Sequence, residues 1–258
     1  MTQPLNSMSR RRSFVPREQI RNGVASLPPD QVHHLRDVLR LKAGEEVEVF
    51  DGEGRCYLGK VQLHGTQMRI EGLQEFCLPE QSHVWITLAP ALIKPDRFEW
   101  ILQKATELGV EEIIPLATRF SEIRVPRSKV ESRLQRWQRI VREASKQCRR
   151  LTVPQIHAPV QFQELLSLEQ SPSTTKLLFY ERAATSWSST GPLTDRVLIC
   201  TGPEGGWDSG EVEEASRAGF GIFNLGPRIL RAETAALAVL AVIQFNAETL
   251  RDRSSIVD

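Results

Sequence analysis

The chain has 258 residues, of which 40% are hydrophobic and 25% charged, and its formal net charge is +1. This composition excludes a globally disordered chain, and the length favours two domains. The longest apolar run, Ala235–Ile243, is much shorter than the about 20 residues that cross a membrane, and no apolar stretch follows the basic N-terminus as in a secretory signal. The four cysteines lie far apart without a CxxC pair, which predicts reduced thiols and a cytoplasmic protein. The histidines lack metal-ligand spacing, which predicts that no metal is bound.

Positive charge is concentrated in two segments. Residues 119–150 hold eleven Lys or Arg against three Glu, residues 1–21 hold five Arg against one Glu, and the rest of the chain carries a net −11. An acidic body with basic patches is typical of a polyanion-binding protein, and Arg suits bidentate phosphate contacts. An Arg-rich, solvated helix face is the alternative. The candidate phosphate contacts are Arg10, Arg11, Arg12, Arg133, Arg136, Arg139, Arg142, Arg149 and Arg150.

The first 80 residues combine short strands with one helix. A strand is predicted at Ser13–Pro16, and helical spacing of apolar residues predicts a helix between Leu27 and Gly44. The alternation Glu46-Val47-Glu48-Val49 predicts a half-buried strand, and further period-two pairs extend to Ile70. These patterns predict a small β-barrel-like domain, an architecture that is frequent among RNA-binding modules.

From Val84 onward, strands and helices alternate, which predicts an α/β domain with a mostly parallel sheet. The predicted strands are Val84–Leu88, Val110–Leu116, Lys176–Tyr180, Val197–Cys200 and Gly221–Leu225. The predicted helices are Pro95–Leu108, a long helix opened by a Ser128-x-x-Glu131 capping box, a helix capped by Asp208-x-x-Glu211, and an apolar helix from about Glu233. The outer face of the long helix carries the arginine row.

A glycine-rich loop, Thr201-Gly202-Pro203-Glu204-Gly205-Gly206-Trp207, follows the predicted strand Val197–Cys200. Glycine lets the backbone turn sharply and approach a ligand closely, and open α/β sheets bind ligands at the carboxyl ends of their strands. The loop matches neither of the usual phosphate-loop patterns, which disfavours ATP and dinucleotides. It indicates another kind of ligand site, with an ordinary glycine-rich turn as the alternative.

A second loop runs through Leu225-Gly226-Pro227-Arg228-Ile229-Leu230-Arg231-Ala232-Glu233-Thr234-Ala235-Ala236 into the last helix. Glu233 and Thr234 suit a helix N-terminus, because the dipole favours an acid there and a hydroxyl satisfies free backbone amides. A cation is unfavourable at this end, so Arg231 indicates either a function or a buried pairing with an acid. A capped core helix with an incidental salt bridge is the alternative.

These two loops together resemble those of the RsmE family, SPOUT-class enzymes that methylate N3 of a uridine in bacterial 16S ribosomal RNA. The shared motifs are Gly202-Pro203-Glu204-Gly205-Gly206 and Leu225-Gly226-x-Arg228-Ile229-Leu230-Arg231-x-Glu233-Thr234-Ala235. The resemblance continues in Lys94-Pro95-x-Arg97, Gln103-Lys104-x-x-Glu107-Leu108-Gly109, Arg119-Phe120-Ser121-Glu122, Glu143-Ala144-x-x-Gln147-x-x-Arg150 and His34-Leu35-x-x-Val38-Leu39-Arg40. It therefore spans nearly the whole chain. The longer N-terminus and Cys148-Arg149, where the family more often has Ser-Gly, depart from the pattern.

The resemblance implies a PUA-like β-barrel RNA-binding domain over residues 1–80 and a trefoil-knotted, parallel-sheet methyltransferase domain over residues 81–258. It implies a homodimer without metal, S-adenosylmethionine as the cofactor, and 16S rRNA or the small ribosomal subunit as the partner, with uridine 1498 as the expected target. Arg40 becomes a further candidate RNA contact. The implied cofactor-binding residues are Phe179, Tyr180, Glu181, Thr201, Gly202, Pro203, Glu204, Gly205, Gly206, Leu225, Gly226, Arg228, Ile229, Leu230, Arg231, Glu233, Thr234 and Ala235.

The chemistry of the target atom narrows the candidate catalytic residues. N3 of uridine is mostly protonated at neutral pH and lies on the Watson–Crick edge, so the base must be unpaired or flipped out and the proton must leave. An arginine can stabilise the anionic base and a carboxylate can take the proton. Arg231, Glu204 and Glu233 are therefore the candidates. Ribose 2′-O methylation and a non-catalytic RNA-binding assembly factor are the competing hypotheses.

Overall fold

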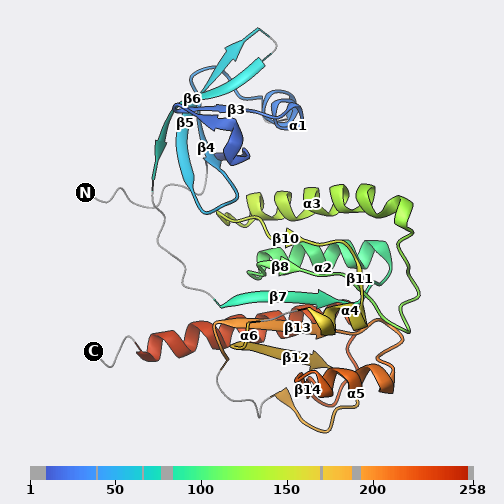
Figure 1. Ribbon diagram of the computed structural model, residues 1–258. Coiled ribbons are helices and arrows are strands. Elements are labelled where there is room, and N and C mark those ends of the chain that lie inside the picture. Colours follow the sequence, from blue (N-terminus) through green and yellow to red (C-terminus); the bar gives the residue numbers. More distant parts are fainter. Residues whose placement is uncertain are drawn as a thin grey trace. The chain divides into compact units, whose positions relative to one another are not determined.

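The computed structural model describes residues 10–38, 40–65, 67–76, 84–168, 171–187 and 193–254 (Figure 1). The chain forms two compact units. The N-terminal unit comprises residues 1–81 together with residues 145–153, which we call the returning segment, and the C-terminal unit comprises residues 82–144 and 154–258. The sequence assigns the returning segment to the second domain, whereas the structure packs it with the first.

The N-terminal unit is built on a six-stranded sheet. Its strand order is β1 (Arg11–Phe14), β4 (Glu46–Phe50), β5 (Cys56–His64), β6 (Gln67–Glu75), β3 (Val24–Ser26) and β2 (Ile20–Arg21). The β1–β4 pair is parallel and the other pairs are antiparallel. A 3₁₀ turn (Arg17–Gln19) precedes β2, and helix α1 (Pro29–His33) continues as a π-helix (His34–Val38). The predicted helix and strands are present, and the first strand begins two residues earlier than predicted.

Glu48 departs from the predicted alternation of β4, because its side chain is buried. Its carboxylate lies 2.7 Å from Arg12 Nε and 2.6 Å from Arg149 Nη2. Arg12 also donates to the main-chain oxygens of Ser145 and Arg150, at 3.3 and 2.8 Å. The returning segment therefore covers this face of the sheet, where a buried carboxylate is tolerated because it is paired and hydrogen-bonded.

The C-terminal unit contains a six-stranded sheet in which every strand pair is parallel, as the strand–helix alternation predicts. The strand order is β10 (Gln155–Ile156), β8 (Glu112–Ile113), β7 (Trp85–Pro90), β13 (Arg196–Thr201), β12 (Thr174–Phe179) and β14 (Gly221–Phe223). A second, two-stranded sheet pairs β9 (Leu116–Ala117) with β11 (Val160–Gln161). The helices are α2 (Pro95–Glu107), α3 (Val130–Gln147), α4 (Phe162–Ser167), α5 (Ser209–Arg217) and α6 (Ala232–Ser254).

Two local predictions for this unit are wrong and one is confirmed. Residues 110–116 form β8 and the start of β9 rather than one strand, because Pro115 cannot donate to a ladder. Ser128 lies inside a 3₁₀ turn, Arg127–Lys129, and is not an N-cap. The box at α5 is formed, since Asp208 Oδ1 accepts from the Gly210 amide at 3.0 Å and Glu211 Oε2 accepts from the Asp208 amide.

Strands β13, β12 and β14 are neighbours in this sheet and run in the same direction (Figure 1). Their carboxyl ends therefore meet at one edge, and the loops that follow them start close together. A buried cluster that includes Leu178, Leu198, Cys200 and Trp207 packs beneath this edge. Across the described part of the chain, no helix is long and apolar enough to cross a membrane.

Candidate functional site

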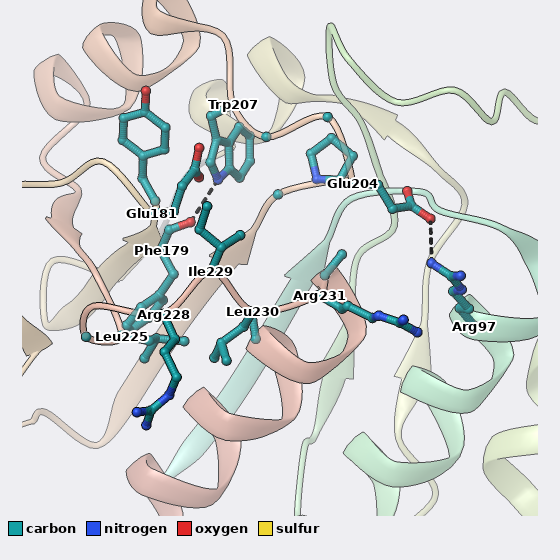
Figure 2. Close-up of a pocket in the computed structure, with 18 residues that line it drawn as sticks. Arg97, Phe179, Glu181, Glu204, Trp207, Leu225, Arg228, Ile229, Leu230 and Arg231 are labelled. Carbon is teal, nitrogen blue, oxygen red and sulfur yellow. Dashed lines mark hydrogen bonds and ion pairs between the residues drawn. The ribbon is translucent and has the colours of Figure 1, made fainter.

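A pocket of about 540 Å³ opens where the loops after β12, β13 and β14 converge (Figure 2). This volume is in the range of small-molecule sites. The lining residues are Arg97, Phe179, Tyr180, Glu181, Gly202, Pro203, Glu204, Gly205, Gly206, Trp207, Leu225, Gly226, Arg228, Ile229, Leu230, Arg231, Ala232 and Ala235. The three segments that hold the implied cofactor-binding residues, 179–181, 201–206 and 225–235, thus surround one cavity.

The structure brings together fifteen of the eighteen residues named from the resemblance as cofactor-binding. Thr201 is instead buried at the end of β13, and Glu233 and Thr234 lie in the first turn of α6 without lining the pocket. Sequence reasoning missed Arg97, Trp207 and Ala232 as lining residues. Trp207 follows the glycine run directly, which is a usable signal, whereas the motif around Arg97 gave no indication of where its side chain lies.

Trp207 connects the loop after β13 with the loop after β12. Its indole Nε1 donates a 2.9 Å hydrogen bond to the main-chain oxygen of Phe179 (Figure 2), and its ring packs against Phe162 at 4.9 Å between centroids. A Cβ at Gly202 would lie only 2.9 Å from the same indole nitrogen. The loop after β13 therefore needs glycine at position 202, because the ring of Trp207 packs against this part of the backbone.

Gly205 and Gly206 are required for two different reasons. Gly206 has φ +76°, a left-handed conformation that glycine adopts without a steric cost. A Cβ at Gly205 would instead lie 3.0 Å from Phe120 Cβ and 3.3 Å from the Phe120 main-chain oxygen. The sequence predicts that glycine at this position lets the backbone approach a ligand. In the structure, the atoms closest to Gly205 belong instead to the loop that carries Phe120.

The loop that carries Phe120 is fixed by hydrogen bonds that are buried or partly buried. The hydroxyls of Thr118 and Ser121 lie 2.8 Å apart, and the Arg119 amide donates to Glu211 Oε1 at 2.9 Å. Burial raises the pKa of the Glu211 carboxyl, while amide donors oppose this effect. Gly205 therefore packs against a well-supported neighbour rather than against solvent.

The loop after β14 is joined to the loop after β12 through Asn224. Its amide donates to Thr185 O at 2.9 Å, its Nδ2 donates to Ala183 O at 2.7 Å, and its Oδ1 accepts from the Gly226 amide at 2.9 Å. All three loops are thus held by hydrogen bonds within the protein itself, as is usual for the largely pre-formed sites of small molecules.

The charged side chains of the site are arranged around Arg97. Arg97 Nη1 lies 3.6 Å from Glu204 Oε1, and its Nε lies 3.9 Å from Glu233 Oε1. Arg231 directly precedes α6 and is exposed, and it forms no ion pair with an acid in the described part of the chain. Of the two interpretations offered for Arg231, the buried pairing is therefore absent, and a function at the pocket wall remains.

The candidate RNA contacts differ in their surroundings. Arg12 is buried and Arg149 is paired with Glu48, so neither is free for a phosphate as expected from charge alone. Arg136 forms a bidentate pair with Glu99, at 2.5 and 2.7 Å. The other candidates are exposed or half-buried: Arg10, Arg11, Arg40, Arg133, Arg139, Arg142 and Arg150.

Comparisons with known proteins agree with this fold and site. Residues 80–244 match the model of an RNA methyltransferase domain, and residues 27–63 match that of an RNA methyltransferase PUA domain. The fold and site thus define a SPOUT-type RNA methyltransferase domain joined to a PUA-like domain.

Similar proteins specify the family. The chain is 35% identical over 238 residues to the ribosomal RNA small subunit methyltransferase E of Synechocystis, covering 90% of this chain and 76% of that protein. It is 32% identical to the protein of the same name from Bacillus subtilis, with 88% and 91% covered. A crystal structure of the Neisseria gonorrhoeae protein of that name, bound to S-adenosylmethionine, matches with a TM-score of 0.84 at 32% identity, covering 92% and 97% of the two chains. The chain belongs to the ribosomal RNA small subunit methyltransferase E family.

Proposed function

We propose that this protein transfers a methyl group from S-adenosylmethionine to N3 of one uridine, expected to be uridine 1498, in 16S rRNA during maturation of the small ribosomal subunit. The observation that carries the proposal is the preformed pocket at the edge of β12, β13 and β14, in a chain of this family. The Neisseria gonorrhoeae relative, which matches over nearly its whole length, is bound to S-adenosylmethionine.

The residues of the pocket fit this cofactor. Its volume of about 540 Å³ suits a nucleoside with an amino-acid tail. A side chain at Gly202 or Gly206 would meet Trp207 or Glu181, so at these two positions the backbone itself forms the pocket wall. Ile229 and Leu230 add apolar surface, and Ile229 is 85% exposed at the pocket wall. When bound, the cofactor supplies an activated methyl group and requires no metal or covalent nucleophile.

The remaining chemistry falls to side chains of the chain itself. Glu204 lies on the pocket wall with 26% of its side chain exposed, and this position supports its role as the acceptor of the N3 proton. Arg231, on the same wall, supplies positive charge for the uracil as the proton leaves. Glu233 is buried deeper and acts through Arg97 rather than on the base.

Binding of the RNA involves both units of the chain. The PUA-like unit and the arginines that are exposed or half-buried contact the phosphate backbone, with Arg133 and Arg139 on α3 as the main contacts in the second unit. We also place the protein in the cytoplasm and expect it to act as a homodimer whose C-terminal unit is knotted, as the family resemblance implies. Size measurement in solution tests the dimer.

Mass analysis of the modified nucleoside tests the reaction. Small subunits assembled from transcribed 16S rRNA and small-subunit proteins are incubated with protein and S-adenosylmethionine, and the RNA is then digested to nucleosides. The proposal predicts 3-methyluridine at one position. Ribose-methylated uridine would instead indicate 2′-O transfer, and tight RNA binding without any methylated product would indicate an assembly factor.

A further inference from the structure

Arg97 occupies a central place among the charged groups of the pocket. It is the third residue of α2, far in sequence from the three loops, yet its side chain lines the pocket that these loops form. Its guanidinium lies between Glu204, in the loop after β13, and Glu233, at the start of α6. Two carboxylates from different elements therefore orient one arginine at the cavity wall, and Figure 2 shows the pairing of Arg97 with Glu204.

The geometry leaves the donors of Arg97 available. The distances of 3.6 and 3.9 Å to the two glutamates are longer than hydrogen bonds, which measure about 2.7 to 3.2 Å. Arg97 forms no hydrogen bond with any residue that the structure describes, and 33% of its side chain is exposed. Ion pairs this long contribute little to stability. A role in stabilising the fold therefore does not explain why Arg97 lies between the two glutamates. An oriented guanidinium with free N–H groups is suited to bind an anion.

Arg231 lies at the same end of the pocket. Figure 2 shows its side chain extending toward Arg97 and Glu204, whereas Arg228 points away from them. When a uracil loses its N3 proton, the negative charge is shared by N3 and by the two carbonyl oxygens that flank it, O2 and O4. Two guanidinium groups converging on one end of a pocket match this pair of oxygens.

We propose that Arg97 is a catalytic residue that, together with Arg231, binds the carbonyl oxygens of the target uracil and stabilises the anion formed at N3. Glu204 and Glu233 orient Arg97 before the substrate arrives, and Glu204 is the carboxylate that takes the proton. This inference rests on the function proposed above and adds a residue from outside the three loops to the reaction.

The step is balanced in protons and electrons. The N3–H proton moves to a carboxylate oxygen of Glu204, and the electron pair of that bond stays on the uracil, where Arg97 and Arg231 stabilise it. The lone pair on N3 then forms the N–CH₃ bond, and the electron pair of the broken S–CH₃ bond remains on sulfur. Glu204 returns its proton to solvent after the product leaves.

Single-turnover methylation of small subunits, with cofactor and RNA saturating, tests the proposal in Arg97→Ala and Arg97→Lys proteins. Removal of one preorganised donor typically lowers the rate about 100- to 1000-fold, so Arg97→Ala should be slower by about that factor while its calorimetric affinity for S-adenosylhomocysteine stays near wild type. Lysine keeps the charge without the planar fork and should restore part of the rate. The matched control is Arg217→Ala, which removes an equally long ion pair, 3.8 Å, from the exposed surface of α5 and should leave the rate unchanged.

A more acidic substrate separates stabilisation of the anion from a structural role. Fluorine at C5 withdraws electrons and acidifies N3, so 16S rRNA transcribed with 5-fluorouridine triphosphate needs less help from Arg97. The deficit of Arg97→Ala should shrink several-fold on this RNA. A deficit of the same size on both RNAs, or no deficit, overturns the role of Arg97. If Arg97→Ala does not fold, the methylation rates of Arg97→Gln on the two RNAs are compared instead, and its deficit should likewise shrink several-fold on the fluorinated RNA. Lack of methylation by the wild-type protein would instead refute the proposed function itself.

Discussion

Trp207 offers the sharpest test of how the pocket is held open. Replacement by phenylalanine keeps an aromatic ring in a site that is only 4% exposed, but it removes the 2.9 Å hydrogen bond to the main-chain oxygen of Phe179. That oxygen would then lie next to a phenyl ring with no donor from position 207. Because Phe179 and Trp207 belong to different loops of the pocket, the substitution disconnects the two loops.

The magnitude follows from these contacts. An acceptor left without its partner in the interior costs about 1 to 3 kcal/mol, and the smaller ring loses part of its packing against Phe162, which adds about 1 kcal/mol. Trp207→Phe should therefore lower the free energy of unfolding by about 2 to 4 kcal/mol. For a domain of this size, this corresponds to a decrease in Tm of roughly 5 to 15 °C.

The assays are urea denaturation followed by circular dichroism, and calorimetric titration with S-adenosylhomocysteine. The affinity for S-adenosylhomocysteine should fall about tenfold or more. Binding must then order the two disconnected loops, and each increment of about 1.4 kcal/mol that this ordering costs weakens the affinity about tenfold. Trp100→Phe is the matched control, because that side chain is 44% exposed and its truncation should change stability by less than about 0.5 kcal/mol. A Trp207→Phe protein as stable as the control, with unchanged affinity, would refute the account of the loops.

Three further predictions concern single sites. Gly205→Val should displace the loop that carries Phe120 and abolish cofactor binding, and a folded variant with wild-type calorimetric affinity would contradict this. Alanine at Arg133 and Arg139 should each reduce the log–log salt slope of RNA binding by about 0.7 to 0.9, whereas an unchanged slope would make this row a solvated helix face. Arg231→Ala should slow single-turnover methylation about 100- to 1000-fold with cofactor affinity nearly intact, and Arg231→Lys should recover part of the rate; wild-type speed at saturation would exclude a catalytic role.

The pocket was largely predictable because its signals are local. A glycine run directly after a buried strand places a loop at the carboxyl edge of a parallel sheet, and the structure confirms this for Gly202–Gly206 after β13. The loop from Leu225 follows β14 in the same way, and the order of the strands makes the two loops neighbours through β12. The two motifs and the direction of the strands therefore placed two walls of the cavity at the correct edge of the sheet, whereas the third wall, residues 179–181, came from the family resemblance, and the strand order came from the structure.

The partners of individual side chains could not be predicted in this way. Nothing in the alternation around Glu48 shows that residues about 100 positions later cover its outer face and supply Arg149 as an ion partner. The same limit applies to Arg97, because periodicity places it near the start of a helix but does not say which loops that helix faces. Such contacts depend on tertiary packing, so only the structure assigns them.

Charge counting illustrates the same limit, with a consequence for RNA binding. The sequence gives residues 119–150 a net charge of +8, yet several of these cations are already paired: Arg119 lies 3.4 Å from Asp208, Arg136 binds Glu99 and Arg149 binds Glu48. A paired arginine must lose its carboxylate before it can neutralise a phosphate, so its contribution to affinity is reduced by the cost of that exchange. Arg133 and Arg139, for which the described part of the chain supplies no acidic partner, should therefore account for much of its salt dependence, and the number of counterions released on binding should fall well below the number of arginines in the sequence.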